Sequence, residues 1–183
     1  MTEKRDNRRV TMTKLLMKNA LLELLDQKEL SSITVTAVCE TADVHRSTFY
    51  KYYNTPADLL REIEQDYLDH IPVPPQTVGH LNQESLLVAN TAFFDYVKEN
   101  GKSFRILFGR QHDNGFALRM VEFICSGYIP VGEQPDEQTA RFVRLYIANG
   151  TVGMLREWIN ADFPVSTRKI AEMMYFLSRK LIS

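Results

Sequence analysis

The sequence is poor in the features that mark membrane, secreted and disulfide-stabilised proteins. It contains no uninterrupted apolar run of about 18 residues, which a membrane-spanning helix requires. Its charged first ten residues lead into no apolar signal core, so we expect no secretory signal. The two cysteines, Cys39 and Cys125, lie far apart in apolar helical patterns, and we expect buried free thiols in a reducing cytosol. These absences favour a cytoplasmic protein that does not bind membranes.

Residues typical of enzymes and metal centres are also scarce. The chain has four histidines, His45, His70, His80 and His112. None of them shows metal-ligand spacing with another histidine or with a cysteine. The sequence has no glycine-rich phosphate loop and no nucleophile elbow. We therefore expect no catalysis, no cofactor and no metal, and a small-molecule enzyme hidden in the C-terminal helices is kept only as a rival hypothesis.

What the 183 residues do contain is helical periodicity. Hydrophobic residues make up 44% of the chain and charged residues 25%, which is ordinary for a globular protein. Apolar residues recur at helical spacing, and no stretch alternates as a strand would. We expect an all-α protein of about nine helices, over residues 10–29, 35–42, 46–52, 56–70, 85–100, 103–108, 114–128, 135–161 and 166–182. Gly101 is expected to close the fifth of them as a C-terminal cap.

Three prolines, Pro72, Pro74 and Pro75, stop helical structure and mark a domain boundary. We expect a three-helix helix-turn-helix domain over residues 1–54 and a connecting helix over residues 55–70. A helical domain for effector binding and dimerisation is expected over residues 71–183.

Charge is divided unevenly along the chain, although the total is only −1. Residues 1–54 carry a net charge of +2, and the first eighteen residues alone carry +4. That excess comes from Lys4, Arg5, Arg8, Arg9, Lys14 and Lys18. A basic N-terminal end fits an electrostatic footprint for phosphates, but it also fits a solvated disordered arm.

The stretch from Ile33 to Tyr53 indicates two short helices joined by a tight turn. Small or apolar residues at the spacing of a steep helix contact are Val35, Val38, Cys39, Ala42, Val44 and Phe49. Asp43 occupies the turn position where a left-handed residue is usual. With the apolar side chains turned inward, five side chains point out: Thr36, Arg46, Ser47, Tyr50 and Lys51.

These outward side chains suit DNA. Arginine can bond guanine through two parallel hydrogen bonds, hydroxyl groups can reach bases or phosphates, and lysine can neutralise a phosphate. The expected helix N-termini near Thr34, His45 and Thr55 offer free N–H groups to phosphates. An ordinary helical hairpin with a polar outer face is the alternative that the bare pattern leaves open.

The pattern ITV-x-x-V-x-x-x-A-x-V-x-R-x-TFY-x-YY, followed by Asp58-Leu59-Leu60, resembles the DNA-binding domain of the TetR/AcrR family of bacterial transcriptional regulators. The resemblance covers roughly residues 10–68, and both helices, the turn and the next helix start agree together. It implies that the helix over Arg46–Tyr53 reads DNA and that Tyr53 packs inward.

The resemblance also assigns individual contacts. It places Thr48, Tyr50 and Tyr52 at the DNA backbone. It places Thr36, Arg46, Ser47 and Tyr50 at base edges. The candidate DNA-binding residues are therefore Thr34, Thr36, His45, Arg46, Ser47, Thr48, Tyr50, Lys51, Tyr52 and Thr55. The chain departs from the family pattern twice: Asp43 stands for the usual turn glycine, and Pro56 stands for a lysine that often contacts a phosphate.

The long helix expected over residues 135–161 is apolar on more than one side, so it should be buried on more than one side. One side can meet its own core and the other a second subunit. A homodimer built as a four-helix bundle is what the resemblance implies. The candidate dimer residues are Asn149, Gly150, Gly153, Trp158, Met173, Met174 and Leu177.

The family usually carries a pocket for a small-molecule effector in this domain. Candidate lining residues are Phe93, Phe94, Tyr96, Phe104, Phe123, Tyr128 and Tyr146. Aromatic residues at helical spacing are more often plain core, and that alternative stays open. We expect a ligand-responsive homodimeric repressor of a palindromic DNA operator, with an effector of unknown identity. The alternative is a co-regulator or protein-interaction module of the same fold with weak or no DNA binding of its own.

Overall fold

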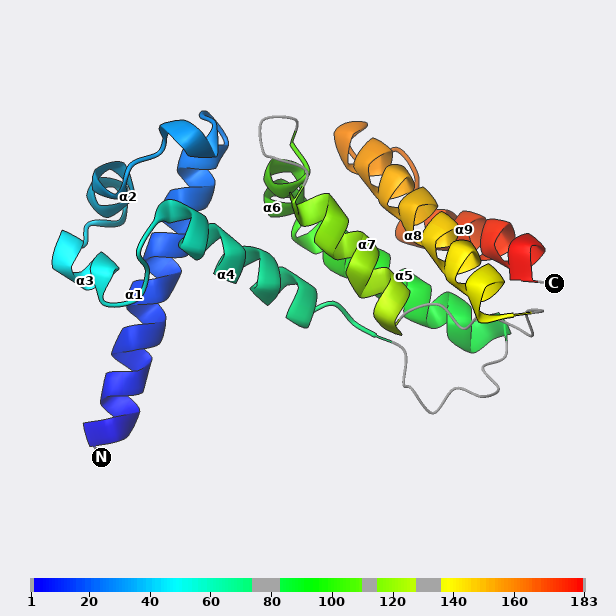
Figure 1. The fold of residues 1–183 in the computed structure, drawn as a ribbon, viewed down its shortest axis with the longest axis horizontal. Coiled ribbons are helices and arrows are strands. Elements are labelled where there is room, and N and C mark those ends of the chain that lie inside the picture. The colour runs from blue at the N-terminus through cyan, green and yellow to red at the C-terminus, as the bar shows by residue number, and fades with distance from the viewer. Residues whose placement is uncertain (1, 74–82, 110–114, 128–135, 183) are drawn as a thin grey trace. The chain divides into compact units, whose positions relative to one another are not determined.

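The computed structural model describes residues 2–73, 83–109, 115–127 and 136–182. Its elements are α1 (Thr2–Leu25), a 3-10 turn η1 (Leu30–Ser32), α2 (Val35–Ala42), α3 (Arg46–Tyr50), α4 (Pro56–Asp69), α5 (Gln83–Glu99), α6 (Gly101–Leu107), α7 (Gly115–Gly127), α8 (Glu137–Asn160) and α9 (Thr167–Ile182). The described ranges contain no strand, so the predicted all-α class is confirmed (Figure 1). No helix in these ranges is long and apolar enough to cross a membrane.

The helices form two compact units, one containing α1 to α4 and the other α5 to α9. In the first unit α1 packs against α2 and α4, and α2 packs against α3. In the second unit α9 lies along α5, and α8 packs against α6, α7 and α9 (Figure 1). Each unit therefore has its own core.

Two helix boundaries differ from those expected. α1 begins at Thr2, so the backbone of the basic N-terminal residues is part of a helix, and it ends at Leu25 rather than near residue 29. The predicted cap at Gly101 is wrong, because Gly101 is the first residue of α6. Asn100 serves both helices: its N–H donates to the carbonyl of Tyr96, and its carbonyl accepts from the N–H of Phe104, each at 3.1 Å. The Asn100 side chain also donates to the Tyr96 carbonyl at 2.9 Å, so the chain turns from α5 into α6 through Asn100 and not through a glycine cap.

The start and end of α2 follow from two residues. The hydroxyl oxygen of Thr34 accepts a hydrogen bond from the N–H of Ala37 at 3.1 Å, which caps the helix N-terminus. Asp43 ends the helix in the left-handed region, with φ 51° and ψ 49°. The N–H of Val44 then reaches back to the carbonyl of Cys39 at 3.0 Å, as in a Schellman motif. The predicted turn at Asp43 is confirmed.

The core of the first unit is built from apolar residues of all four helices. Its members below 8% exposure include Met17, Leu21, Leu25, Val38, Cys39, Ala42, Phe49, Tyr53, Leu59, Leu60 and Ile63. Leu16 is 45% exposed, and it lies with Met12 and Leu15 on the outer side of α1. Phe49 is fully buried and fixes α3 to this core.

Candidate nucleic-acid interface

The outer face of α3 carries the side chains that the sequence assigns to DNA. Arg46, Ser47, Tyr50 and Lys51 are exposed, while Thr48 is half-buried. The buried neighbour Phe49 supports the Tyr50 ring edge-on, with ring centroids 5.9 Å apart and an interplanar angle of 88°. The Tyr50 side chain is 58% exposed, and its ring rests on the buried Phe49 ring. The arrangement presents a cation, a hydroxyl and an aromatic ring on one short helix.

The N-terminus of α3 lacks a side-chain cap. His45 is the N-cap residue, with φ −70° and ψ 145°, and its side chain makes no capping hydrogen bond. The first amides of α3 are thus not satisfied by the cap side chain, and a helix N-terminus in this state suits an anion. Thr36, on α2, is half-buried.

The start of α4 is already occupied. The backbone N–H of Thr55 donates to Oδ2 of Asp58 at 2.9 Å, and the Thr55 hydroxyl donates to the same oxygen at 3.0 Å. The N–H of Asp58 returns a bond to the Thr55 hydroxyl oxygen at 3.2 Å, which completes a capping box. The hydrogen bond from Thr55 lowers the pKa of Asp58, so its carboxylate stays charged. Both donors of Thr55 are used here, so a phosphate would have to displace a carboxylate.

Two lysines of α1 do not point to solvent as a phosphate footprint requires. Lys14 Nζ lies 3.0 Å from Oε2 of Glu62 on α4. Lys18 Nζ lies 2.7 Å from Oε1 of Glu62 and also pairs with Asp66. Lys14 and Lys18 belong to the six basic N-terminal residues that the sequence assigns to phosphates, but in the structure they hold α1 to α4. Arg8 and Arg9, by contrast, are exposed.

The pKa shifts in this ion-pair cluster agree with one another. Burial by itself raises the pKa of Glu62, but the hydrogen bonds from Lys18 and Lys14 outweigh it and the net shift is downward. Burial lowers the pKa of Lys18, and its hydrogen bonds to Asp66 and Glu62 outweigh that effect, so the net shift is upward. Both charged forms are therefore favoured in the folded unit.

The aromatic residues that follow α3 lie against this cluster. Tyr53 is 5% exposed, and its pKa is raised well above its ordinary value by burial and by the negative charge of Glu62. The inward position implied for Tyr53 is thus observed. Tyr52 is half-buried, with the Nζ of Lys14 at 5.6 Å and that of Lys51 at 5.5 Å from its ring centroid. These cation–π distances restrain Lys51 beside the outer face of α3.

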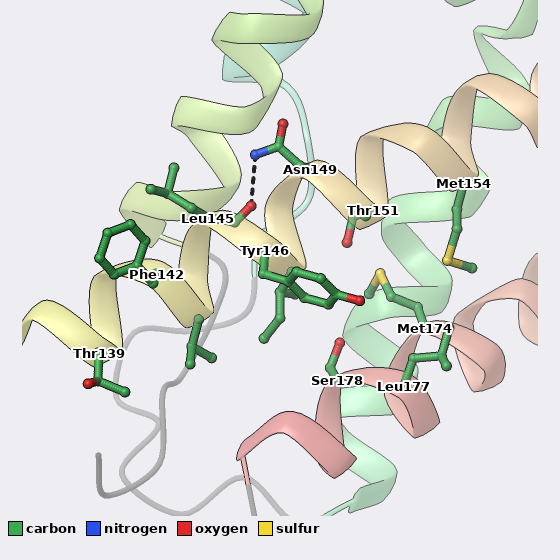
Figure 2. A pocket seen from close by; sticks show the side chains of 13 residues that line it. Thr139, Phe142, Leu145, Tyr146, Asn149, Thr151, Met154, Met174, Leu177 and Ser178 are labelled. Atoms are coloured by element: carbon green, nitrogen blue, oxygen red, sulfur yellow. Dashed lines mark hydrogen bonds between the residues drawn. The ribbon is translucent and has the colours of Figure 1, made fainter. Parts of the chain in front are cut away.

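In the second unit, a groove of about 1270 Å³ lies between α8 and α9. Its lining residues are Thr139, Phe142, Val143, Leu145, Tyr146, Ile147, Asn149, Gly150, Thr151, Met154, Met174, Leu177 and Ser178. Figure 2 shows the Tyr146 ring extending from α8 toward α9, where Met174, Leu177 and Ser178 lie. The Asn149 side chain is turned back onto its own helix and donates to the carbonyl of Leu145 at 2.8 Å.

The residues assigned to an effector pocket differ in burial, although Phe93 meets Phe94 and Tyr96 meets Phe104 edge-on. Phe93, Phe94 and Phe104 are at most 1% exposed and belong to the aromatic core. Tyr96 and Phe123 are half-buried. Tyr146 is 69% exposed in the α8–α9 groove, and Tyr128 lies outside the described residues. Of the six described residues in this set, Tyr146 lines the α8–α9 groove and the other five do not.

The residues assigned to a dimer face are mostly on the outer side of α8 and α9. Asn149, Gly150, Gly153, Met173 and Leu177 are exposed, and Met174 is 8% exposed at the groove. Trp158 differs: it is 3% exposed, and its ring meets Phe94 and Phe163 inside its own unit. The sequence assignment omits two large side chains on the outer side, Phe142 and Phe176. Phe142 lies one helical turn before Tyr146, at i, i+4 spacing, and this spacing could have indicated that Phe142 belongs to the same face.

Comparison with known proteins agrees with this architecture. The family model described as "Transcriptional regulator C-terminal region" matches residues 88–180, just over half of the chain. The helix-turn-helix transcriptional regulator YxbF of Bacillus subtilis strain 168, itself uncharacterised, is 24% identical over 168 residues. The match covers 88% of this chain and 43% of YxbF, so the chain spans less than half the length of that relative.

Solved structures share the fold at low identity. A TetR transcriptional regulator from Streptococcus agalactiae 2603V is 21% identical, with a TM-score of 0.72 over 96% of this chain and 98% of its own. NalD, the secondary repressor of the MexAB-OprM multidrug efflux pump in Pseudomonas aeruginosa, is 16% identical, with a TM-score of 0.67 over 97% and 98%. The dihydroxyacetone kinase operon activator DhaS is 18% identical, with a TM-score of 0.63 over 93% and 96%.

The chain has a helix-turn-helix unit, α1 to α4, followed by a helical unit that the family model matches over residues 88–180. This protein belongs to the TetR family.

Proposed function

We propose that the protein is a homodimeric repressor that binds a palindromic DNA operator through α3 of each subunit. The observation that carries the proposal is the outer face of α3, where Arg46, Ser47, Tyr50 and Lys51 are exposed while Phe49 anchors the helix. Arg46 and Tyr50 would contact base edges, and Lys51 would contact a phosphate. A dimer bound to its operator would block access of other proteins to that DNA, which is the simplest route to repression.

The outer face of α8 and α9 supports dimerisation. Phe142 and Tyr146 on α8 are 62% and 69% exposed, and Phe176 and Leu177 on α9 are 58% and 52% exposed. Contiguous exposed apolar side chains of this size mark interaction surfaces in soluble proteins. A second copy related by a two-fold axis would cover the same face on both subunits. Two copies of α3 could then read half-sites about one DNA turn apart, or a small multiple of it.

We further propose that a small apolar molecule binds among the helices of the second unit and changes the separation of the two α3 helices. Among the predicted pocket residues, Tyr96 and Phe123 are half-buried, so part of each side chain stays accessible. A shift of a few ångströms between the α3 helices would prevent both half-sites from being engaged together, so the gain from two linked contacts would be lost.

Selection of bound sequences from a random double-stranded DNA pool tests the proposal. A palindromic winner whose affinity falls steeply with salt is expected. Arg46→Ala should reduce sequence discrimination by about 1–3 kcal/mol per half-site. The matched control is Arg168→Ala, which removes an exposed arginine of α9 and should leave discrimination unchanged. Absence of any salt-sensitive, sequence-selective binding would reject this function.

A co-regulator that binds another protein is the second candidate. It is favoured by the start of α4, where Pro56 has no N–H and Asp58 occupies the amide of Thr55. Together with the pairing of Lys14 and Lys18, this reduces the number of groups free to bind phosphates. On this alternative, Arg46→Ala would not alter any DNA binding that remains, and partner binding would survive it.

A further inference from the structure

The turn between α8 and α9 contains two successive residues in the left-handed region. Asp162 has φ 59° and Phe163 has φ 58°. Aspartate tolerates this region, but a bulky aromatic residue there is an outlier. Pro164 follows directly, and a residue before proline favours the extended region. Strain of this kind persists only where surrounding contacts hold it.

Contacts from α8 hold one side of the turn. The N–H of Phe163 donates to the carbonyl of Trp158 at 2.8 Å, and the N–H of Asp162 donates to that of Ile159 at 3.1 Å. The Phe163 ring meets the Trp158 ring edge-on, with centroids 4.8 Å apart. The indole N–H of Trp158 then donates to the carbonyl of Val165 at 3.0 Å. A C-terminal cap of this type requires one left-handed residue, so the second one needs another cause.

That cause comes from α6, more than fifty residues earlier in the chain. The guanidinium of Arg105 donates to the carbonyl of Ile159 at 3.0 Å and to Oδ1 of Asp162 at 2.7 Å. Gly101, the first residue of α6, receives the Phe163 ring: a Cβ at position 101 would lie 2.6 Å from its Cζ and 2.9 Å from its Cε2. The Phe163 ring also contacts the Trp158 ring, which limits how far it can move away from position 101.

We propose that Asp162 and Phe163 form a conformational latch, closed by Gly101 and Arg105, that couples the position of α6 to the angle between α8 and α9. While α6 holds the turn, the start of α9 is fixed relative to the end of α8. When the first turn of α6 moves away, the Phe163 ring loses its contact with Gly101, and the Phe163 backbone relaxes toward the extended region. The consequence for function rests on the proposed homodimer, because α8 and α9 carry the groove that contains Tyr146 and Met174.

The chain supplies its own reporter for the latch. Trp158 is the single tryptophan of the sequence and packs directly on Phe163. Arg105→Ala is expected to shift the tryptophan emission of the full chain to longer wavelength and to raise acrylamide quenching at least twofold, with the far-UV circular dichroism unchanged. Arg168→Ala, which removes another arginine ion pair on α9, is the control and should behave as wild type. Quenching of Arg105→Ala equal to that of wild type would overturn the latch.

A second pair of variants tests the contact between Gly101 and Phe163 independently of fluorescence. Replacing glycine by alanine in a helix ordinarily stabilises a protein. Here Gly101→Ala should lower the thermal midpoint of the wild type by about 5 °C, because the new methyl group overlaps the Phe163 ring. In a Phe163→Ala background the same change should leave the midpoint unchanged or raise it. Equal effects of Gly101→Ala in both backgrounds would overturn the proposal.

Sedimentation equilibrium separates the latch from the dimer. Arg105→Ala should weaken self-association at least tenfold relative to wild type and to Arg168→Ala. If wild type is monomeric at every concentration, the proposed homodimer fails, while the fluorescence and thermal results still decide the latch. If acrylamide quenching shows that the latch of Arg105→Ala is open, but this variant self-associates as tightly as wild type, the coupling to α8 and α9 is overturned.

Discussion

Lys18 of α1 lies 2.7 Å from Glu62 of α4, so a lysine that the sequence groups with phosphate-binding residues is instead part of the contact between two helices. Glu62 bridges Lys18 and Lys14, and the lysine side chains are only 16% and 30% exposed. Such an ion pair is worth more than an exposed one, because water screens it less. The first unit therefore uses positive charge of α1 for its own cohesion.

Glu62→Gln should destabilise the first unit. The substitution keeps the shape of the side chain but removes the charge that both lysines share, so we expect a loss of about 1–2 kcal/mol. Guanidinium unfolding followed by far-UV circular dichroism would measure it. The control is Glu172→Gln, which breaks an exposed i, i+4 pair with Arg168 on α9 and should cost less than about 0.5 kcal/mol. Equal costs for the two variants would contradict the role given to Glu62.

The difference between wild type and Glu62→Gln should depend on pH in a defined direction. The pKa of Glu62 is lowered from its ordinary 4.5, so its contribution is present above that value and is lost as the pH falls through the folded pKa. The pKa of Lys18 is raised from 10.5, so its contribution is present below that value and is lost as the pH rises through the folded pKa. The difference in unfolding free energy should be constant between about pH 5.5 and 9.5 and shrink outside that window. A difference that grows toward acid pH would show that the sign is wrong.

Asp43→Gly should stabilise the turn between α2 and α3. Asp43 is left-handed, and glycine adopts this region without the steric cost of a Cβ, so we expect a gain of about 0.5–1 kcal/mol. Asp43→Val should lower the free energy of unfolding by about 1–2 kcal/mol, because a β-branched residue fits the left-handed region poorly. Thermal unfolding of the two variants beside wild type checks both signs. A stabilising valine would exclude the left-handed turn.

Phe49→Ala should abolish binding to the proposed DNA operator, because α3 would lose the side chain that anchors it. Removal of a fully buried phenylalanine costs about 3–5 kcal/mol, and α3 has only five residues with which to hold its position. Tyr50→Ala is the comparison, because Tyr50 is exposed and its loss should leave stability nearly unchanged while weakening DNA binding. Unfolding and electrophoretic mobility-shift measurements on both proteins separate the two roles. Loss of stability in Tyr50→Ala would mean that it is a core residue.

Tyr146→Glu should prevent self-association. In the proposed homodimer, a charge at this groove residue would be buried against the other subunit without a partner, which costs about 2–5 kcal/mol. Analytical ultracentrifugation would show a monomer with unchanged far-UV circular dichroism. Val88→Glu provides the control, because Val88 is 64% exposed on α5 and is not one of the residues that line the groove. A Tyr146→Glu protein that still dimerises would place the interface on another face.

Local chemistry explains what could be predicted from the sequence. Thr34, Asp43 and the Thr55-Pro56-Asp58 start of α4 act through neighbours three to five residues away, so their roles are visible in the chain itself. Phe49 follows from the apolar spacing of the helix-turn-helix segment. The sequence alone does not reveal the contact of Gly101, because the Phe163 ring that packs on it comes from a residue 62 positions later.

The sequence by itself determined the helical class, the helix-turn-helix segment and the outward set of Arg46, Ser47, Tyr50 and Lys51, because periodicity and capping are short-range properties. Only the tertiary structure decided which charges are free and which faces are open. It paired Lys14 and Lys18 with Glu62, turned Trp158 into the core and left Tyr146 in an exposed groove. These outcomes depend on side chains brought together from distant helices, and a charge or an aromatic ring has the same appearance in a sequence whether its partner is solvent or another helix.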